Sequence, residues 1–196
     1  MRNADRLLNT ARAVFTEAGP DASLDEIARR AGVGIRTLYR HFPRKADLLR
    51  AVLNQRVAED LSPVIASALE DEDPLHGLST LIEAAVEMVA REDNTLAAAK
   101  HAGTLTPELS AAFFDALTEL ARRAQRARLL RADLVPEDLP RIMAMITSVL
   151  RSMDPETEGW RRYLGFLLDG LSPAAASVQP SAPPLAQTPQ KGDWLH

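Results

Sequence analysis

The sequence of 196 residues contains no cysteine, few aromatic residues and no long apolar run. The absence of cysteine excludes disulfide bonds, a thiol nucleophile and a zinc site built on thiolates. No apolar segment approaches the roughly 18 residues that a membrane-spanning helix needs, so we expect no membrane partner. The first six residues lead into an amphipathic pattern and not into the apolar core of a signal peptide, which favours a cytoplasmic protein.

Charge is unevenly distributed along the chain, although the formal net charge is only −4. Residues 1–56 hold 11 Lys and Arg against 6 Asp and Glu, a net charge of +5. Residues 57–196 hold 12 against 21, a net charge of −9. A basic N-terminal segment on an acidic remainder favours a protein that presents one end to phosphate groups. On these numbers alone, chance clustering of surface charge is also a reasonable interpretation.

Apolar residues spaced three and four apart predict helices over nearly the whole chain, and no segment shows the alternation of a strand. A first helix ends at Gly19-Pro20, because proline cannot continue it. Ser23 and Glu26 form the pattern of a capping box, in which each side chain accepts from the other residue's backbone N–H. Two short helices follow, and the second runs from about Gly34 to Phe42.

The remaining pattern predicts a helical second domain. A long helix carries apolar residues from Leu48 to Leu69 and is expected to kink at Pro63. Further helices follow Asp73-Pro74 and Thr106-Pro107, and Asp93-Asn94 indicates a break between them. The fold class is therefore all-α, with an N-terminal helix-turn-helix domain over 1–46 and a helical domain over 47–172. Five of the 24 residues in 173–196 are proline, which predicts a flexible tail.

A glycine turn joins the two short helices, and this arrangement is typical of a helix-turn-helix. In that motif the second helix lies in the major groove of DNA, and its N-terminal residues contact base edges. The residues expected to be buried are Ile27, Ala28, Ala31, Val33, Leu38 and Phe42. The residues expected to point outward are Ile35, Arg36, Thr37, Tyr39 and Arg40.

The outward residues suit contacts with DNA. An arginine such as Arg36 can donate two hydrogen bonds to guanine, and Ile35 can pack on a thymine methyl group. Tyr39, His41 and Lys45 suit phosphate oxygens, which set the position of the protein and not its sequence preference. The backbone amides at the start of the Ser23 helix suit a further phosphate.

The segment from Ser23 to Leu49 resembles the DNA-binding signature of the TetR family. The resemblance is specific over about residues 5–56 and is architectural beyond them. Ser23 stands where threonine is more usual, and Gly34 stands where serine is common, which weakens the cap of the second short helix. The matching positions are Ser23, Ile27-Ala28, Ala31-Gly32-Val33, Thr37-Leu38-Tyr39, His41-Phe42 and Lys45.

The resemblance implies a one-component regulator, most simply a repressor, that binds a palindromic double-stranded DNA operator as a homodimer and is released by a small-molecule effector. The implied effector pocket includes Met88, His101, Phe113 and Phe114, although each of these is also consistent with a purely structural role. The implied dimer face comprises Ile142, Met143, Ile146, Val149, Leu150, Trp160, Leu164, Leu167, Leu168 and Leu171. The alternative for this second set is the core of a single chain.

The other signals in the sequence are weaker. The four histidines are scattered, so we expect no metal site, and no motif indicates a cofactor. A basic run late in a helix allows a second DNA contact, but cations near a helix C-terminus are also favoured by its dipole. An all-helical enzyme, or a ligand sensor that acts through a protein partner, are the alternative functions. The basic run comprises Arg122, Arg123, Arg126, Arg128 and Arg131.

Overall fold

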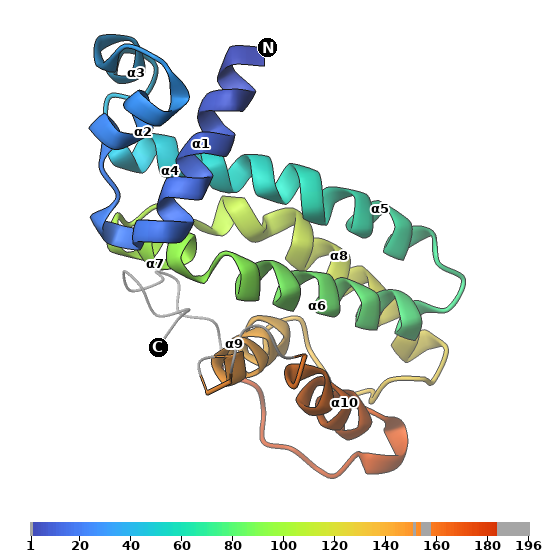
Figure 1. Cartoon of the computed structure of the whole chain (residues 1–196). Coiled ribbons are helices and arrows are strands. Elements are labelled where there is room, and N and C mark those ends of the chain that lie inside the picture. The colour runs from blue at the N-terminus through green and yellow to red at the C-terminus, as the bar shows by residue number, and fades with distance from the viewer. Residues whose placement is uncertain (1, 151, 154–157, 184–196) are drawn as a thin grey trace. The chain divides into compact units, whose positions relative to one another are not determined.

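The computed structural model describes residues 2–150, 152–153 and 158–183, and these residues are helical with no strand among them. The predicted all-α fold class is confirmed (Figure 1). The helices are α1 (Arg2–Ala18), α2 (Leu24–Ala31), α3 (Ile35–His41), α4 (Lys45–Arg56), α5 (Ser62–Glu70), α6 (Pro74–Arg91), α7 (Asp93–His101), α8 (Pro107–Arg126), α9 (Asp138–Leu150) and α10 (Trp160–Gly170).

The chain forms two compact units, and each unit combines two segments that are separated in the sequence. Unit 1 comprises residues 1–59 and 92–109, and unit 2 comprises residues 60–91 and the chain from residue 110 onward. Helix α7 therefore belongs to the same unit as α1–α4, although two helices separate it from them in sequence. The break expected at Asp93-Asn94 lies one residue earlier, at Glu92 between α6 and α7, and Asp93-Asn94 open α7. The functional division expected at residue 46 stays a prediction.

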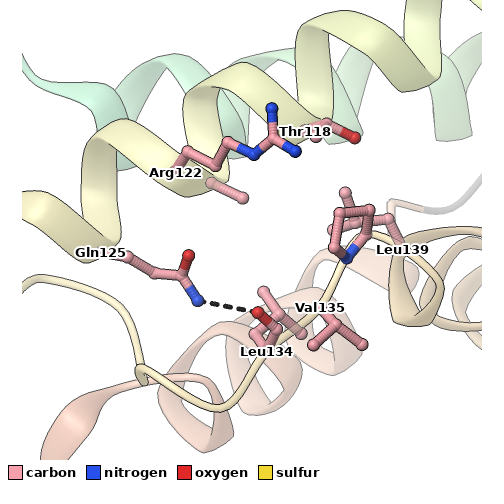
Figure 2. A pocket seen from close by; sticks show the side chains of 8 residues that line it. Thr118, Arg122, Gln125, Leu134, Val135 and Leu139 are labelled. Carbon is pink, nitrogen blue, oxygen red and sulfur yellow. Dashed lines mark hydrogen bonds between the residues drawn. The ribbon is translucent and has the colours of Figure 1, made fainter. Parts of the chain in front are cut away.

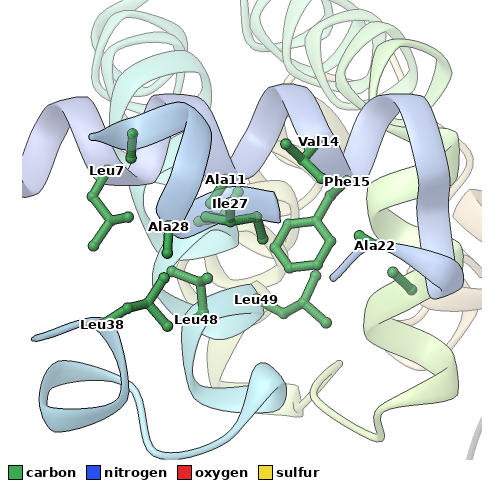
Figure 3. Close-up of a cluster of buried hydrophobic side chains, with 13 residues drawn as sticks. Leu7, Ala11, Val14, Phe15, Ala22, Ile27, Ala28, Leu38, Leu48 and Leu49 are labelled. Carbon is green, nitrogen blue, oxygen red and sulfur yellow. The ribbon is translucent and has the colours of Figure 1, made fainter. Parts of the chain in front are cut away.

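The core of unit 1 lies between α1, α2, α3 and α4 (Figure 3). Phe15, Ile27 and Leu38 are fully buried in it, one from each of the first three helices. Leu48 and Leu49 close it from α4, and Ala98 of α7 joins the same cluster. Since a buried large aliphatic or aromatic side chain contributes about 1.5–3 kcal/mol, this cluster supplies most of the energy that holds the helices together.

Regular α-helix is interrupted between α4 and α5, as the position of Pro63 predicts. Residues Val57–Leu61 form a π-helical turn, and Pro63 follows within the first turn of α5. Proline lacks an N–H, and its ring clashes with the carbonyl four residues earlier, here that of Glu59. Hydrogen bonds that run five residues back give this carbonyl room, so the turn accommodates the proline without ending the helical path.

Unit 2 depends on a close approach of α5 and α6. A Cβ atom at Gly77 would lie 2.6 Å from the carbonyl oxygen of Ala68 and 3.1 Å from a methyl group of Leu120. Only glycine therefore fits where these helices cross. At the other side of α6, Arg161 of α10 forms ion pairs with Glu83 and with Glu87, the latter at 2.6 Å.

The predicted tail is described only in its first part. Pro173–Ala175 form a 3₁₀ turn, and the residues that follow to 183 are exposed and without regular structure. Arg131 holds the start of this segment, because its guanidinium donates to the carbonyl of Ser177 at 3.0 Å. Residues 184–196, which make up the rest of the predicted tail, lie outside the described residues.

Candidate nucleic-acid interface

A serine cap and a left-handed glycine fix the geometry of the helix pair α2–α3. The Ser23 hydroxyl accepts hydrogen bonds from the backbone N–H of Asp25 at 3.2 Å and of Glu26 at 3.5 Å. Gly32 has φ +64°, a conformation that costs other residues about 1 kcal/mol or more. The chain then turns so that the N–H of Val33 donates to the carbonyl of Ala28 at 3.0 Å. The expected helix-turn-helix is thus present.

The face of α3 that packs on the core includes one residue that the sequence analysis expects to point outward. Leu38 is fully buried, and Phe42 packs on the same core. Ile35 is half-buried and packs there too, so the prediction that it points outward is wrong. The reason is helical spacing: residues 35, 38 and 42 lie three and four apart and form one stripe. A role for Ile35 on a thymine methyl group is therefore weakened.

The outer face of α3 is basic and exposed. Arg36, Thr37, Tyr39, Arg40 and His41 are all exposed, and the helix contains no acidic residue. In the part of the chain that the structure describes, no carboxylate pairs with Arg36 or Arg40. These two arginines are four residues apart and share a helix face. Their guanidinium groups are therefore available to an outside anion or base.

The arginines of α2 are in a different situation. Arg29 and Arg30 both bond to the carboxylate of Glu26, at 2.7 and 2.6 Å, and Arg30 also bonds to Glu17 of α1 at 2.6 Å. The guanidinium groups of Arg29 and Arg30 hold the pKa of Glu26 below its ordinary value. The Glu26 carboxylate thus serves these ion pairs, and not the second half of the expected capping box.

The basic residues at the start of α4 also have partners inside the chain. Arg44 donates to Asp47 from its backbone N–H and its guanidinium, which lowers the pKa of Asp47. Lys45, expected at a phosphate, donates to the carbonyl of Pro20 and lies over the ring of Phe15, with 5.8 Å between its Nζ and the ring centroid. Burial lowers the pKa of Lys45, while nearby Asp21 opposes this change. The structure thus gives Lys45 a role in tying α4 to the end of α1.

Comparison with known proteins assigns this fold and this site to one family. Residues 7–52 match the family model of bacterial regulatory proteins of the tetR family. A TetR transcriptional regulator from Streptomyces coelicolor is 30% identical with a TM-score of 0.64, over 87% of this chain and 99% of that one. The repressor LfrR from Mycolicibacterium smegmatis is 34% identical over 142 residues, which are 65% of this chain and 67% of that protein. The chain belongs to the TetR family.

Membership in the TetR family makes this chain a transcriptional regulator with a DNA-binding helix-turn-helix, and not an enzyme. A further sequence likeness covers only part of each protein. The regulator TtgW from Pseudomonas putida is 48% identical over 52 residues, but the match covers 39% of that protein's length and 26% of this chain. The family model matches residues 7–52, the segment that contains the helix-turn-helix.

The residues expected in a TetR effector pocket lie in different surroundings. His101 is exposed at the end of α7 in unit 1. In unit 2, Phe113 is buried, while Phe114 and Met88 are half-buried. The rings of Phe113 and Phe114 meet edge to face, with 5.1 Å between their centroids. None of the four lines the cavity described next.

A cavity in unit 2 lies between α8 and the loop that precedes α9 (Figure 2). Only about 10 Å³ of it is open to the centre of a water molecule, which is roughly the room that one water needs. This is far below the range of about 300–1,000 Å³ typical of ligand sites. Thr118, Arg122 and Gln125 line it from α8, and Leu134, Val135 and Leu139 lie across from them. The Gln125 side chain joins the two sides by donating to the carbonyl groups of Arg131 and Leu134.

The residues expected at a TetR dimer face are divided between core and surface. Val149, Leu150, Leu167 and Leu168 are half-buried. The chain itself buries the other six of the ten, so in the single chain these serve as core. They are Ile142, Met143, Ile146, Trp160, Leu164 and Leu171. The expected dimer face does not include Met145, which is 57% exposed on α9, or Tyr163 and Phe166, which are 43% and 56% exposed on α10.

The basic run of α8 is mostly held within unit 2. Arg123 donates to the carbonyl groups of Leu69 and Asp71, and Arg131 pairs with Asp133 at 2.6 Å. Arg126 pairs with Glu119 at 3.3 Å.

Within the described ranges, no helix is long and apolar enough to cross a membrane, and no cluster of His, Asp and Glu is arranged to hold a metal ion.

Proposed function

We propose that this chain is a repressor that binds a palindromic operator as a homodimer and leaves it when a small-molecule effector binds. The observation that carries the DNA-binding part is the outer face of α3, where Arg36 and Arg40 are exposed and have no internal carboxylate. Arginine in the major groove reads guanine through two hydrogen bonds, while Thr37 reaches either base type. Tyr39 and His41 stand beside them and suit phosphate oxygens.

The other proposed DNA contacts follow from the pairing of each cation. Ser23 and the N-terminal amides of α2 suit a phosphate, because the hydroxyl is exposed and a helix N-terminus favours an anion. Gly34 brings the backbone at the start of α3 close to DNA without a side chain. Lys45 contributes by holding α4 in position and not by contacting a phosphate. Specificity thus rests on Arg36, Thr37 and Arg40.

Homodimer formation is supported by an apolar surface on α9 and α10. Met145 is exposed on α9, and Tyr163 and Phe166 are exposed on α10, where their rings meet edge to face with 6.3 Å between the centroids. The half-buried leucines and valine of the expected interface belong to the same two helices. Exposed apolar side chains in a group are typical of an interaction surface. A second copy meeting this surface through a two-fold axis yields a symmetric dimer, and a symmetric dimer requires a palindromic operator.

Repression and release by an effector are supported by the relatives. LfrR is named as a repressor, and a structure of LfrR holds proflavine. For this chain we propose a mainly apolar effector bound in unit 2 near Met88, Phe113 and Phe114, with no metal or cofactor needed. His101 is left out because it is exposed in unit 1.

The test begins with DNA selected from a random-sequence library by the purified chain. We expect a partly palindromic duplex, and log K should fall steeply with log salt concentration because several phosphates are neutralised. A shallow slope and no preference over random DNA would refute the proposal.

The dimer is tested by light scattering. Phe166→Glu should yield monomers that bind a half-site but have lost affinity for the full palindrome, with Arg128→Glu as the matched surface control. A variant that stays dimeric removes α10 from the interface.

A further inference from the structure

A buried carboxylate in unit 1 lies where α7 meets helices α1–α4, which we call the DNA-binding head. Glu92 directly precedes α7, and its side chain is 5% exposed. Its Oε1 lies 3.1 Å from Nε of Arg56 on α4 and 3.8 Å from Nη1 of Arg12 on α1. Its Oε2 is buried without a hydrogen-bond partner in the described part of the chain. The charge of Glu92 is therefore balanced by two arginines from two different helices.

Further contacts attach α7 to the head. The Asn94 side chain donates to the carbonyl of Thr16 near the end of α1, at 2.7 Å. The backbone at Gly19 passes close by, since a Cβ there would lie 3.5 Å from the Asn94 carbonyl oxygen. Ala98, one turn further along α7, is buried in the same core as Phe15. Helix α7 thus contacts α1 through both polar and apolar groups.

The helices that Glu92 joins are the two that support the helix pair α2–α3. Helix α1 packs on α2 and on α4, and Leu48 and Leu49 at the start of α4 share the core with Leu38 of α3. A change in the spacing of α1 and α4 therefore changes the place of α3. A buried ion pair adds little net stability compared with apolar residues of the same size, but it requires a particular arrangement of its partners.

We propose that Glu92 is a positioning residue for DNA binding, which holds α1 and α4 at the spacing that α3 needs to enter the major groove. The inference rests on the proposed DNA binding by α3. It adds that α7, distant in sequence and outside the helix-turn-helix, is part of the DNA-binding head. The convergence of Arg12 and Arg56 on one oxygen carries the argument, because the two helices are then held to one point by charge.

The experiment compares Glu92→Gln, Arg56→Gln and the double variant, using the duplex that the wild type selects. Affinity is measured at a temperature where circular dichroism shows each variant to be folded, so that a loss of stability alone leaves it unchanged. We expect Glu92→Gln to weaken binding about tenfold, a common size for such a coupling. The double variant should recover most of this loss, because the more deeply buried Arg56 is then no longer left without the Glu92 carboxylate, while Arg12, 39% exposed, is in contact with water.

Controls separate this inference from the proposed function. Glu119→Gln breaks an exposed pair on α8 and should leave the affinity unchanged. The slope of log K against log salt should be smaller for Glu92→Gln, because fewer phosphates are contacted at once. Wild-type affinity in folded Glu92→Gln overturns the inference while leaving DNA binding intact. Failure of the wild type to select any duplex refutes the proposed function itself.

If Glu92→Gln does not fold, Arg12→Gln takes its place. A smaller but measurable loss of affinity for the duplex then supports the inference, and an unchanged affinity overturns it.

Discussion

Two arginine-rich segments of this chain have similar composition and different surroundings. On α3, Arg36 and Arg40 are exposed, and no described carboxylate pairs with them. At the end of α8, Arg123 and Arg126 bond to groups of their own unit, and Arg131 in the next loop does the same. The number of arginines therefore does not identify a DNA-binding surface. What identifies it is whether the cations already have partners inside the protein.

The largest expected effect is on stability and comes from α8. Arg123→Met removes two hydrogen bonds that a charged donor makes to the carbonyl groups of Leu69 and Asp71. Hydrogen bonds with a charged group contribute about 1.5–3 kcal/mol, so the free energy of unfolding should fall by about that amount. Urea unfolding measures it, with Arg122→Met as the control on the same helix. An unchanged midpoint would show that Arg123 is a solvated surface charge.

The next effect is on DNA binding and comes from α3. Arg36→Ala should weaken binding to the selected duplex by about 1–3 kcal/mol and relax the base preference at one position of each half-site. Arg126→Ala, which removes a paired arginine from α8, should change neither quantity. Fluorescence anisotropy with a panel of single-base variants of the duplex makes the measurement. Equal weakening on every sequence would make Arg36 a phosphate contact, and an effect of Arg126 would end the distinction between the two segments.

A smaller effect is expected at the start of α3. Gly34 is the N-cap of α3 and supplies no side chain, while a Cβ there would contact only the Thr37 hydroxyl, at 3.9 Å. Gly34→Ser therefore fits and should raise the free energy of unfolding by a few tenths of a kcal/mol, the usual difference between these two caps. Thermal unfolding tests this, with Gly32→Ala as the contrasting variant. Gly32 has φ +64°, so alanine there should lower the midpoint.

The smallest effect is a pH dependence beside the residues that Arg123 holds. The Asp71 carboxylate bonds to His76 at 2.6 Å and raises the pKa of His76 above its ordinary 6.5, while His76 lowers the pKa of Asp71 below 3.8. The pair therefore stabilises unit 2 fully between these ordinary values. This contribution is lost as pH rises through the raised pKa of His76 or falls through the lowered pKa of Asp71.

A variant without the His76–Asp71 pair tests this pH dependence, because the difference in stability between the variant and the wild type should change with pH. The unfolding midpoint of His76→Gln should lie below that of the wild type at pH 5 to 6 and approach it at pH 9. Both partners are on the surface, so the difference should be small. A constant difference at every pH would mean that the ion pair contributes nothing.

The sequence predicts the helix-turn-helix well because its signals are local. The cap at Ser23, the glycine at residue 32 and the apolar spacing each act within a few residues. Helix α7 was not predicted, because Asp93-Asn94 resembles a break, and the helix is stabilised by contacts with α1 and α4 that are remote in sequence. The Ala97-Ala98-Ala99 run was the available signal for a helix there.

Individual side chains of the site were harder to predict than the motif. The roles of Ile35 and Lys45 depend on which neighbours each meets, and a pattern of residue types does not contain that information. The same holds for Glu92, whose only sequence signal is a carboxylate between two helices. Its partners Arg12 and Arg56 come from distant segments and are known only from the fold.

The discontinuous head has a consequence for the order in which the protein folds. Residues 1–59 leave the ribosome before the rest of unit 1, so the core they form still lacks Ala98 and the ion pairs of Glu92. Residues 60–91 must be synthesised before α7 can arrive, and the ends of this segment must then meet. Closing such a loop costs entropy that only the finished contacts offset. The first four helices of unit 1 are therefore synthesised before α7, and part of their apolar core stays exposed to solvent until α7 packs against them.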